Sequence, residues 1–427
     1  MAFDMDEMHR RRQEREQQRQ QRAQQQRKMI FRLAVAGAVL IACGILIFVI
    51  SRGDSGNGDL PSAAVTTVPS QTSGEQNQQT PGSLATVVHF AATGDLNITD
   101  KVVASGGMNY DYTKTFMDVL PLLAQADLTA VNLEGVLCGA PYGTATASAP
   151  QTLMTALTNA GVDLVQMANS YAIKNGVSGL RATLQNVRGA GLHPVGAFAD
   201  KEEFEKTGGY TICNVRGVKI ALVAFTKGMD GMALPAGSES CVNVLYSDYS
   251  STYKQVNTQG ITKVLRAAQK EKPDVTIALL HWGSEYNDNH SKTQQEIRKL
   301  MLAEGVDAII GTHPHYVQEM EFDAGAGTFV AYSLGEFLGD ASRAGTEYSA
   351  VLDLEITKDN ATGETKITGY SYTPTFTVEE EDGTVRVVRL EAAMAAYEAG
   401  HIQRVSEQTY NKMVYALERV QDRVTPE

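Results

Sequence analysis

Six short apolar runs, rich in β-branched residues, alternate with amphipathic helical stretches from residue 87 onward. Such alternation is typical of a mostly parallel sheet whose buried strands are covered by helices. We therefore predict an α/β fold with strands at residues 87–95, 128–135, 162–170, 274–283, 306–315 and 329–337. The helical pattern predicts helices at residues 114–126, 150–160, 179–190, 261–271 and 292–304, and residues 210–225 have the pattern of a hairpin turning at 214–217.

Polar side chains follow five of these predicted strands. Ligands bind in open α/β sheets at the carboxyl ends of the strands, so we expect these side chains to share one crevice. His313 and His315 are one residue apart, and an extended chain would turn both imidazoles to the same side. Oxygen and imidazole ligands favour Mn, Fe or Zn over a thiolate-selective metal. The set predicts a site for one or two divalent transition metal ions, formed by Asp95, Glu134, Asn169, His281, His313 and His315.

Each of these residues taken alone also fits a structural role. Turns or helix caps would suit Asp95, Glu134 and Asn169. His281 stands next to Trp282 and could be a buried histidine whose ring is satisfied by hydrogen bonds. Their coincidence at one edge of the sheet is what favours a functional site.

The N-terminal part has a different composition. Residues 33–50 contain no charged residue, and about 20 apolar residues in a helix cross a hydrocarbon core of roughly 30 Å. Nine cations precede this span in residues 1–32, whereas residues 51–83 hold a single one. The positive-inside rule then places the N-terminus in the cytoplasm and the bulk of the chain outside the cell membrane. A cleaved signal peptide is the alternative, which the long preceding arm and the lack of a small-x-small cleavage site disfavour.

These features divide the chain into five expected segments. They are a basic Gln/Arg-rich cytoplasmic arm (1–29), a transmembrane anchor (30–51), a flexible extracytoplasmic linker (52–85), the α/β domain (86–376) and a C-terminal extension (377–427). In the extension we predict a last strand at 386–390 and one or two helices over 391–422, broken near Gly400.

Charge limits the classes of partner. The chain has 37 Lys and Arg against 49 Asp and Glu, a net charge of −12, which argues against nucleic acid as a partner. A chain with this net negative charge would not attract a polyanion by its overall charge. Binding of an anionic polymer would therefore require a metal or a local basic patch. Lys174, Arg181 and Arg188 are candidates for such a patch, although solvated helix surfaces carry similar charges.

Three cysteines follow the predicted anchor. Cys138, Cys213 and Cys241 could form one disulfide with a thiol left over, or remain three unpaired small side chains. The sequence does not choose a pairing.

Six motifs in a definite order resemble the CapA family, the capsule-synthesis proteins linked to poly-γ-glutamate. They are GDLN (94–97), VNLEG (131–135), VDLVQMANS (162–170), HWGSEY (281–286), IIGTHPHYVQ (309–318) and YSLGEF (332–337). The resemblance covers roughly residues 88–376 and implies the fold of calcineurin-type metallophosphoesterases, a two-sheet sandwich flanked by helices, here preceded by one N-terminal transmembrane helix. Members of the family are commonly tethered to the outer face of the membrane.

The resemblance also implies roles. Asp95 would be a ligand of the first metal, Glu134 the carboxylate between two metals and Asn169 a ligand of the second, with the three histidines completing the shells. Three positions depart from the family pattern. The family usually has His where this chain has Tyr171 and Asp where it has Lys174, and it generally has Asn in place of Glu336.

These departures bear on catalysis. A tyrosine is not a cation near neutral pH, so Tyr171 would position substrate by hydrogen bonding, whereas Glu336 could act as an extra ligand or a base. Two functions follow from the resemblance, a metal-dependent hydrolase of an amide or phosphoester, or a non-catalytic subunit of the capsule machinery. The expected partners are an anionic surface polymer or its carrier, and other capsule-synthesis membrane proteins.

Overall fold

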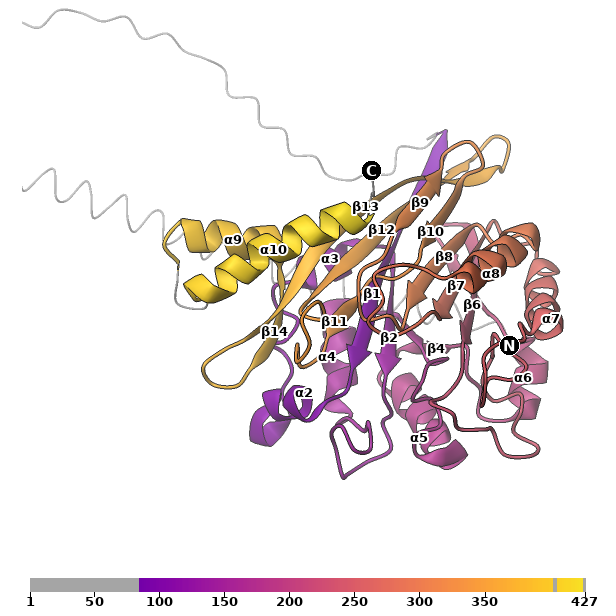
Figure 1. Cartoon of the computed structure of the whole chain (residues 1–427). Coiled ribbons are helices and arrows are strands. Elements are labelled where there is room, and N and C mark those ends of the chain that lie inside the picture. The colour runs from indigo at the N-terminus through magenta and orange to yellow at the C-terminus, as the bar shows by residue number, and fades with distance from the viewer. Residues whose placement is uncertain (1–83, 402–404, 425–427) are drawn as a thin grey trace, which may run out of the picture. The chain divides into compact units, whose positions relative to one another are not determined.

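Two β-sheets stand at the centre of the described chain, which comprises residues 84–401 and 405–424 of a computed structural model (Figure 1). The first sheet has eight strands in the order β14-β13-β12-β1-β2-β3-β4, with β11 pairing with β1 off this path. Strands β1 to β4 run parallel to one another, and β12, β13 and β14 are added in antiparallel fashion. The strands of this sheet are β1 (Ala85–Asn97), β2 (Leu128–Glu134), β3 (Leu164–Gln166), β4 (His193–Val195), β11 (Glu336–Leu338), β12 (Tyr348–Asp359), β13 (Thr365–Glu379) and β14 (Val385–Arg389).

The second sheet has six strands in the order β5-β6-β7-β8-β10-β9. Its central strands β6, β7, β8 and β10 are parallel, and β5 and β9 close the edges in antiparallel fashion. The predicted two-sheet α/β architecture is confirmed. The strands are β5 (Thr211–Val215), β6 (Val218–Thr226), β7 (Val275–His281), β8 (Ala308–Thr312), β9 (Met320–Asp323) and β10 (Thr328–Ala331).

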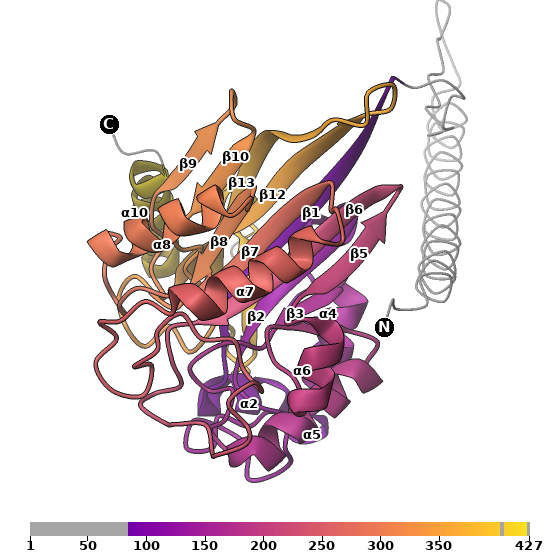
Figure 2. The same cartoon turned by 90° about the vertical axis from the view of Figure 1, so that its right-hand side faces the viewer.

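Both faces of the second sheet are buried, which explains why its strands are apolar throughout. Along β6, Ile220, Leu222 and Ala224 belong to the core that is shared with the first sheet. The alternate residues of the same strand, Ala221 and Val223 among them, pack instead against α7 (Thr258–Gln269) and α8 (Lys292–Ala303). Figure 2 shows these two helices lying across the outer face of the second sheet. Successive side chains of a strand point to opposite faces, so one strand contributes to two cores.

The remaining helices accompany the first sheet or connect the two sheets. Helices α9 and α10 cover β12, β13 and β14, where they contact β13 most (Figure 1). These helices are α2 (Asp100–Ser105), the 3-10 turn η1 (Gly107–Asn109), α3 (Leu120–Gln125), α4 (Thr152–Ala160), α5 (Gly176–Gly189), α6 (Lys201–Thr207), α9 (Leu390–Glu398) and α10 (Glu407–Val424).

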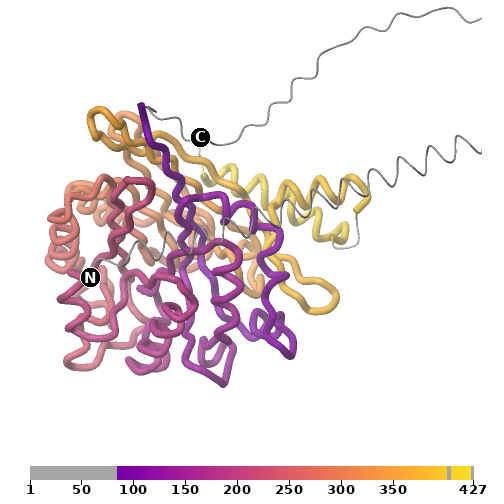
Figure 3. Tube along the Cα trace, turned by 180° about the vertical axis from the view of Figure 1, so that it is seen from behind, coloured from indigo at the N-terminus to yellow at the C-terminus, as the bar shows by residue number. Residues whose placement is uncertain are grey.

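The C-terminal residues belong to the first sheet. Strand β13 continues to Glu379, and β14 pairs with it in register from Thr375 onward. The predicted last strand and the two helices broken near Gly400 are confirmed. At the other end, β1 begins at Ala85 beside the β12–β13 turn, because Ala85 pairs with Asp359 (Figure 3).

Two expected elements differ in the structure. The helix predicted at 114–126 starts only at Leu120, because Pro121 has no N–H and fits the first turn of a helix but not its interior. The run 329–337 is two strands. Strand β10 ends at Ala331 in the second sheet, and β11 begins at Glu336 in the first, with Gly335 at a φ of 82° between them.

The predicted arm, the anchor and the linker up to residue 83 lie outside the described residues. Among the residues that the structure describes, no helix has the length and apolar character that crossing a membrane requires.

Candidate metal centre

Three neighbouring strands of the first sheet bring carboxylates together. Asp95 on β1 is the register partner of Asn132 on β2 and of Glu336 on β11. Glu134 lies two residues beyond Asn132, so both side chains leave β2 on the same face. Gly94 lets β1 approach the segment before β11 closely, since a Cβ there would overlap the carbonyl oxygen of Gly335. Asp95, Glu134 and Glu336 are all buried.

The second sheet supplies the histidines. His281 is the last residue of β7, and His313 follows the end of β8 directly. The expectation of an extended stretch at His313 and His315 is wrong, because their φ values are 95° and 58°. Such positive values are costly for residues other than glycine and persist where the surrounding structure holds them. The main-chain N–H of His313 donates to both carboxylate oxygens of Asp95, at 3.1 and 3.0 Å.

The side chains form two clusters that share one carboxylate. Glu134, His281 and His313 offer one ligand atom each within 4.8 Å of one another, and so do Asp95, Glu134 and His315. Oε1 of Glu134 lies 3.2 Å from Nε2 of His281, and Oε2 lies 3.6 Å from Nε2 of His315. The shared position of Glu134 is the arrangement expected of a carboxylate between two metal ions.

Glu336 extends the second cluster. Its Oε2 lies 3.0 Å from Nδ1 of His315 and accepts a hydrogen bond of 3.3 Å from Asn97. Gly339 leaves room for this carboxylate, because a Cβ at that position would overlap Oε1 of Glu336. Glu336 is therefore placed beside the predicted ligands, as an extra ligand or a base would be.

Asn169 lies beside the clusters, a few residues past β3. Its amide nitrogen donates to the carbonyl of Leu133 at 2.6 Å and to Asn132 at 3.3 Å, and its amide oxygen accepts from the N–H of Tyr171 at 3.0 Å. The amide thus holds the turn before Tyr171 against β2.

Three site residues escaped the sequence analysis. Asn132 donates to Asp95 at 2.7 Å, Ser170 lies 3.0 Å from Nε2 of His281, and Thr312 lies 3.2 Å from Nδ1 of the same ring. The signal for Asn132 was its place two residues before Glu134 on the same face of a strand. Ser170 and Thr312 each adjoin a predicted ligand, but a short hydroxyl side chain carries no signal of its own.

Burial and charge set the protonation states. Burial, together with the charge of Glu134, raises the pKa of Asp95 to about 6, and burial raises the pKa of Glu134 to about 7. Burial lowers the pKa of His281 to about 3 and also lowers that of His313, so both rings are neutral. Burial alone would lower the pKa of His315 too, but the carboxylates around it, Glu134 first, raise it to about 10.

The donor set fits a divalent ion. Oε2 of Glu134 and Nδ1 of His313 are buried and have no hydrogen-bond partner among the described residues. Orphaned buried polar atoms are rare in proteins and call for an explanation such as an ion. Neutral imidazoles and carboxylates are ligands that Mn, Fe and Zn accept.

Tyr171 and Lys174 occupy the turn after β3. The Nζ atom of Lys174 lies 5.6 Å from the ring centroid of Tyr171 and 3.7 Å from a carboxylate oxygen of Asp230. Burial raises the pKa of the Tyr171 phenol, so it is neutral at physiological pH. The other two candidate cations are engaged on α5, Arg188 with Glu203 and Arg181 with the carbonyl of Ala199.

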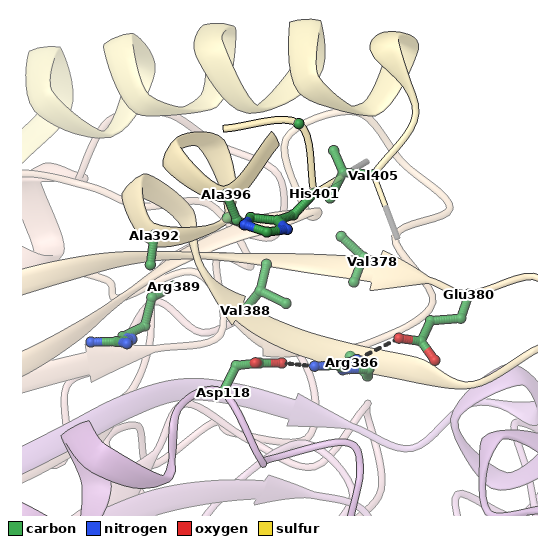
Figure 4. A pocket seen from close by; sticks show the side chains of 12 residues that line it. Asp118, Val378, Glu380, Arg386, Val388, Arg389, Ala392, Ala396, His401 and Val405 are labelled. Atoms are coloured by element: carbon green, nitrogen blue, oxygen red, sulfur yellow. Dashed lines mark hydrogen bonds and ion pairs between the residues drawn. The ribbon is translucent and has the colours of Figure 1, made fainter. Parts of the chain in front are cut away.

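Other polar features lie apart from this centre. A cavity of about 460 Å³ between β14 and α9 contains Arg386, which pairs with Asp118 and Glu380 (Figure 4). Its lining includes none of the predicted site residues. A third cluster, of His290, Glu319 and Glu321, lies elsewhere.

The three cysteines of the described chain, Cys138, Cys213 and Cys241, are all unpaired in the structure. Of the two alternatives that the sequence left open, the structure has the unpaired one.

Comparison with protein families gives a match over most of the folded part. The family described as bacterial capsule synthesis protein PGA_cap matches residues 89–341. A capsule biosynthesis protein CapA of Bacillus anthracis is 28% identical over 215 residues, which is 50% of this chain and 49% of that protein. A PGA biosynthesis protein CapA of Bacillus subtilis (strain 168) is 29% identical over 205 residues, 48% of this chain and 50% of that protein. The chain thus matches about half the length of these relatives.

Solved structures of low similarity were also found. A calcineurin-like phosphoesterase from Bacillus subtilis has 17% identity and a TM-score of 0.40, covering 78% of this chain and 99% of that one. A putative 5'-nucleotidase from Staphylococcus aureus has 10% identity and a TM-score of 0.43, covering 78% of this chain and 58% of that one.

Proposed function

Because the chain belongs to the bacterial capsule synthesis protein family PGA_cap, we propose that it acts in the synthesis or export of an anionic surface polymer of the poly-γ-glutamate type. The names of the two CapA relatives support this choice of polymer. A polymer that is cleaved or handled by this chain would carry negative charge, whereas the chain itself has a net charge of −12. Local groups at the candidate metal centre must therefore provide the attraction.

The proposed activity is metal-dependent hydrolysis of an amide or phosphoester bond in the polymer or its carrier. The observation that carries this proposal is the pair of buried clusters that share Glu134. Asp95, Glu134 and His315 would hold one ion, and Glu134, His281 and His313 the other. An ion bound there would supply Lewis acidity and lower the pKa of water.

The chain's own side chains would do the remaining work. Glu336, next to His315, would take a proton as a general base. Tyr171 would donate a hydrogen bond from its neutral phenol to the substrate. Asn132 and Asn169 would keep the carboxylates and the turn before Tyr171 in place, since they bond to Asp95 and to each other.

A non-catalytic subunit that binds polymer or partner proteins is the second candidate. The observation that favours it is Tyr171 itself, because a neutral phenol cannot stabilise developing negative charge as a cation does. Such a subunit could keep its ions and still turn over no substrate.

We also propose that residues 30–51 anchor the protein in the cell membrane with the folded part outside. The uncharged span and its one-sided cations support this. Protease added to intact cells should remove residues 84–427, and full protection of that part would contradict the topology.

The decisive experiment measures metal and turnover on one preparation of the full chain purified in detergent. We expect one to two divalent transition metal ions per chain, lost in His313→Ala and in Asp95→Ala. Hydrolysis of γ-linked polyglutamate or a phosphoester by the loaded wild type, absent in both variants, would establish the enzyme. Bound metal without turnover of either substrate would favour the binding subunit, and a chain that takes up no metal even after reconstitution would refute the metal centre.

A further inference from the structure

A stack of three side chains leads from the candidate metal centre to the protein surface. The ring of Tyr286 is stacked on that of His315, with centroids 5.5 Å apart and planes inclined by 25°. The guanidinium carbon of Arg343 lies 4.0 Å from the centroid of Tyr286. Arg343 is exposed, whereas His315 is buried, so the stack joins solvent to the centre.

Two loops hold this stack in place. The N–H of Tyr286 donates to the carbonyl of Pro314, between the two histidines, at 2.8 Å. The loop of Arg343 is tied to the same segment, because the hydroxyl of Tyr316, the residue after His315, donates to the carbonyl of Ala344 at 2.7 Å. The carbonyl of Arg343 accepts two more hydrogen bonds, from the N–H and the hydroxyl of Thr346. The backbone beneath the guanidinium is thereby fixed.

Within the described part of the chain, the guanidinium has no carboxylate partner. Across residues 84–401 and 405–424, no Asp or Glu oxygen pairs with Arg343, although other cations of this part of the chain are paired. Among them are Lys174 with Asp230, Arg298 with Glu321, and Arg423 with Asp288. Stacking on Tyr286 orients the guanidinium without using its N–H donors, which remain available to a ligand.

We propose that Arg343, oriented by Tyr286, binds an anionic group of the substrate adjacent to the group at the metal centre. The proposal rests on the proposed function and deepens it, because it assigns the substrate a second negative charge. A guanidinium presents paired donors that match a carboxylate or phosphate. In a γ-linked glutamate chain, every amide is flanked by a free α-carboxylate. This carboxylate is the anionic group that Arg343 would bind when the amide lies at the metal centre. A phosphate group of a polymer carrier has the same chemistry.

The test compares oxyanion binding by the full chain and its variants, in metal-loaded and chelator-treated forms, by calorimetry. The probes are a γ-linked glutamate tetramer, the same tetramer with its α-carboxylates amidated, and pyrophosphate. Arg343→Gln removes the donors, Arg343→Lys keeps the charge without the paired geometry, and Lys412→Gln is the matched control. Lys412 is an exposed cation on α10, so its loss changes net charge equally.

We expect Arg343→Gln to weaken binding of the tetramer about tenfold, the effect of one charge-assisted contact, and Arg343→Lys to weaken it less. Arg343→Gln should leave the metal content and the binding of the amidated tetramer unchanged. Lys412→Gln should bind the tetramer as the wild type does. If only pyrophosphate binds and shows the same dependence on Arg343, the subsite stands with phosphate as its ligand. Equal affinity of wild type and Arg343→Gln for both anions, or no binding of either anion to wild type, would overturn the proposal.

Turnover separates this proposal from the proposed function. Tetramer that binds in an Arg343-dependent way but is never cleaved would support the subsite while contradicting hydrolysis. If cleavage does occur, Arg343→Gln should raise KM by the same factor and leave kcat nearly unchanged.

Discussion

Oε1 of Glu134 lies 3.2 Å from Nε2 of His281, a fully buried contact between a residue of the first sheet and one of the second. The two sheets therefore meet at the candidate centre, and each contributes side chains that the other lacks. Glu134 is also the one residue common to both clusters there.

Glu134→Gln should for this reason lower the affinity for both ions. The substitution keeps the shape of the side chain and removes the charge between the clusters, and we expect metal affinity to fall by about 10–100-fold or more. The measurement is metal content by mass spectrometry after dialysis against a weak chelator. Glu319→Gln is the control, because Glu319 pairs with His290 in the third cluster. Retention of full metal content in Glu134→Gln would show that the ions bind elsewhere.

Tyr171→His combined with Lys174→Asp should raise turnover of a simple phosphoester such as p-nitrophenyl phosphate. An imidazole can carry a positive charge or donate a proton where the phenol stays neutral, and such a contact is worth roughly 10–10³-fold in rate. The comparison is made at matched metal occupancy. Wild-type turnover of about 1–10³ per second would refute the idea that these two residues weaken the site, and no gain in the double variant would show that more has been lost.

Metal affinity should rise as the pH rises from about 6 to 8. The raised pKa values, about 6 for Asp95, about 7 for Glu134 and about 10 for His315, mean that protons occupy the donors an ion needs. Binding must then release protons, and calorimetry in buffers of different ionisation enthalpy counts them. Affinity that is flat across this range, with no proton release, would contradict the assignment of these ligands.

Stability of the metal-free chain should show the opposite trend between pH 7 and 10. The pKa of His315 is raised in the folded state from 6.5 to about 10, so its contribution is complete below 6.5 and is lost as the pH rises through 10. The expected slope is at most about 1.4 kcal/mol per pH unit for one proton. Urea unfolding at several pH values measures it, and His315→Gln should remove the slope if this histidine causes it.

Gly94→Ala should destabilise the fold by about 2 kcal/mol or more, because the new methyl group would overlap the backbone carbonyl of Gly335, which cannot move away like a side chain. Gly189→Ala is the matched control. Gly189 ends α5 with open space around it, so alanine there should be neutral or slightly stabilising. Denaturant midpoints of the two variants compare them, and equal midpoints would contradict the close approach of β1 to Gly335.

The sequence was sufficient for the parallel strands and the polar residues at their ends, because buried strands and their terminal turns have a local pattern. It failed where long-range packing decides. The chain crosses from one sheet to the other between Ala331 and Glu336, and nothing in an apolar run marks such a crossing. The positive φ value at His313 likewise accompanies a hydrogen bond from its N–H to Asp95, 218 residues away.

Arg343 is a residue of the proposed substrate site that could not be predicted from the sequence either. Its motif-free surroundings carry no signal in the sequence, and its position over Tyr286 exists only because two loops after β7 and β11 meet in the folded chain. Site residues at the end of a strand could be predicted from the sequence, whereas those positioned by contacts between two loops could not.

Strand β1 also sets the distance between the start of the described chain and the candidate centre. The described chain enters this strand at Ala85, and Asp95 lies ten residues further along it, a separation of roughly 30 Å at the rise of an extended strand. The point where the described chain enters the first sheet and the candidate centre are therefore near opposite ends of β1.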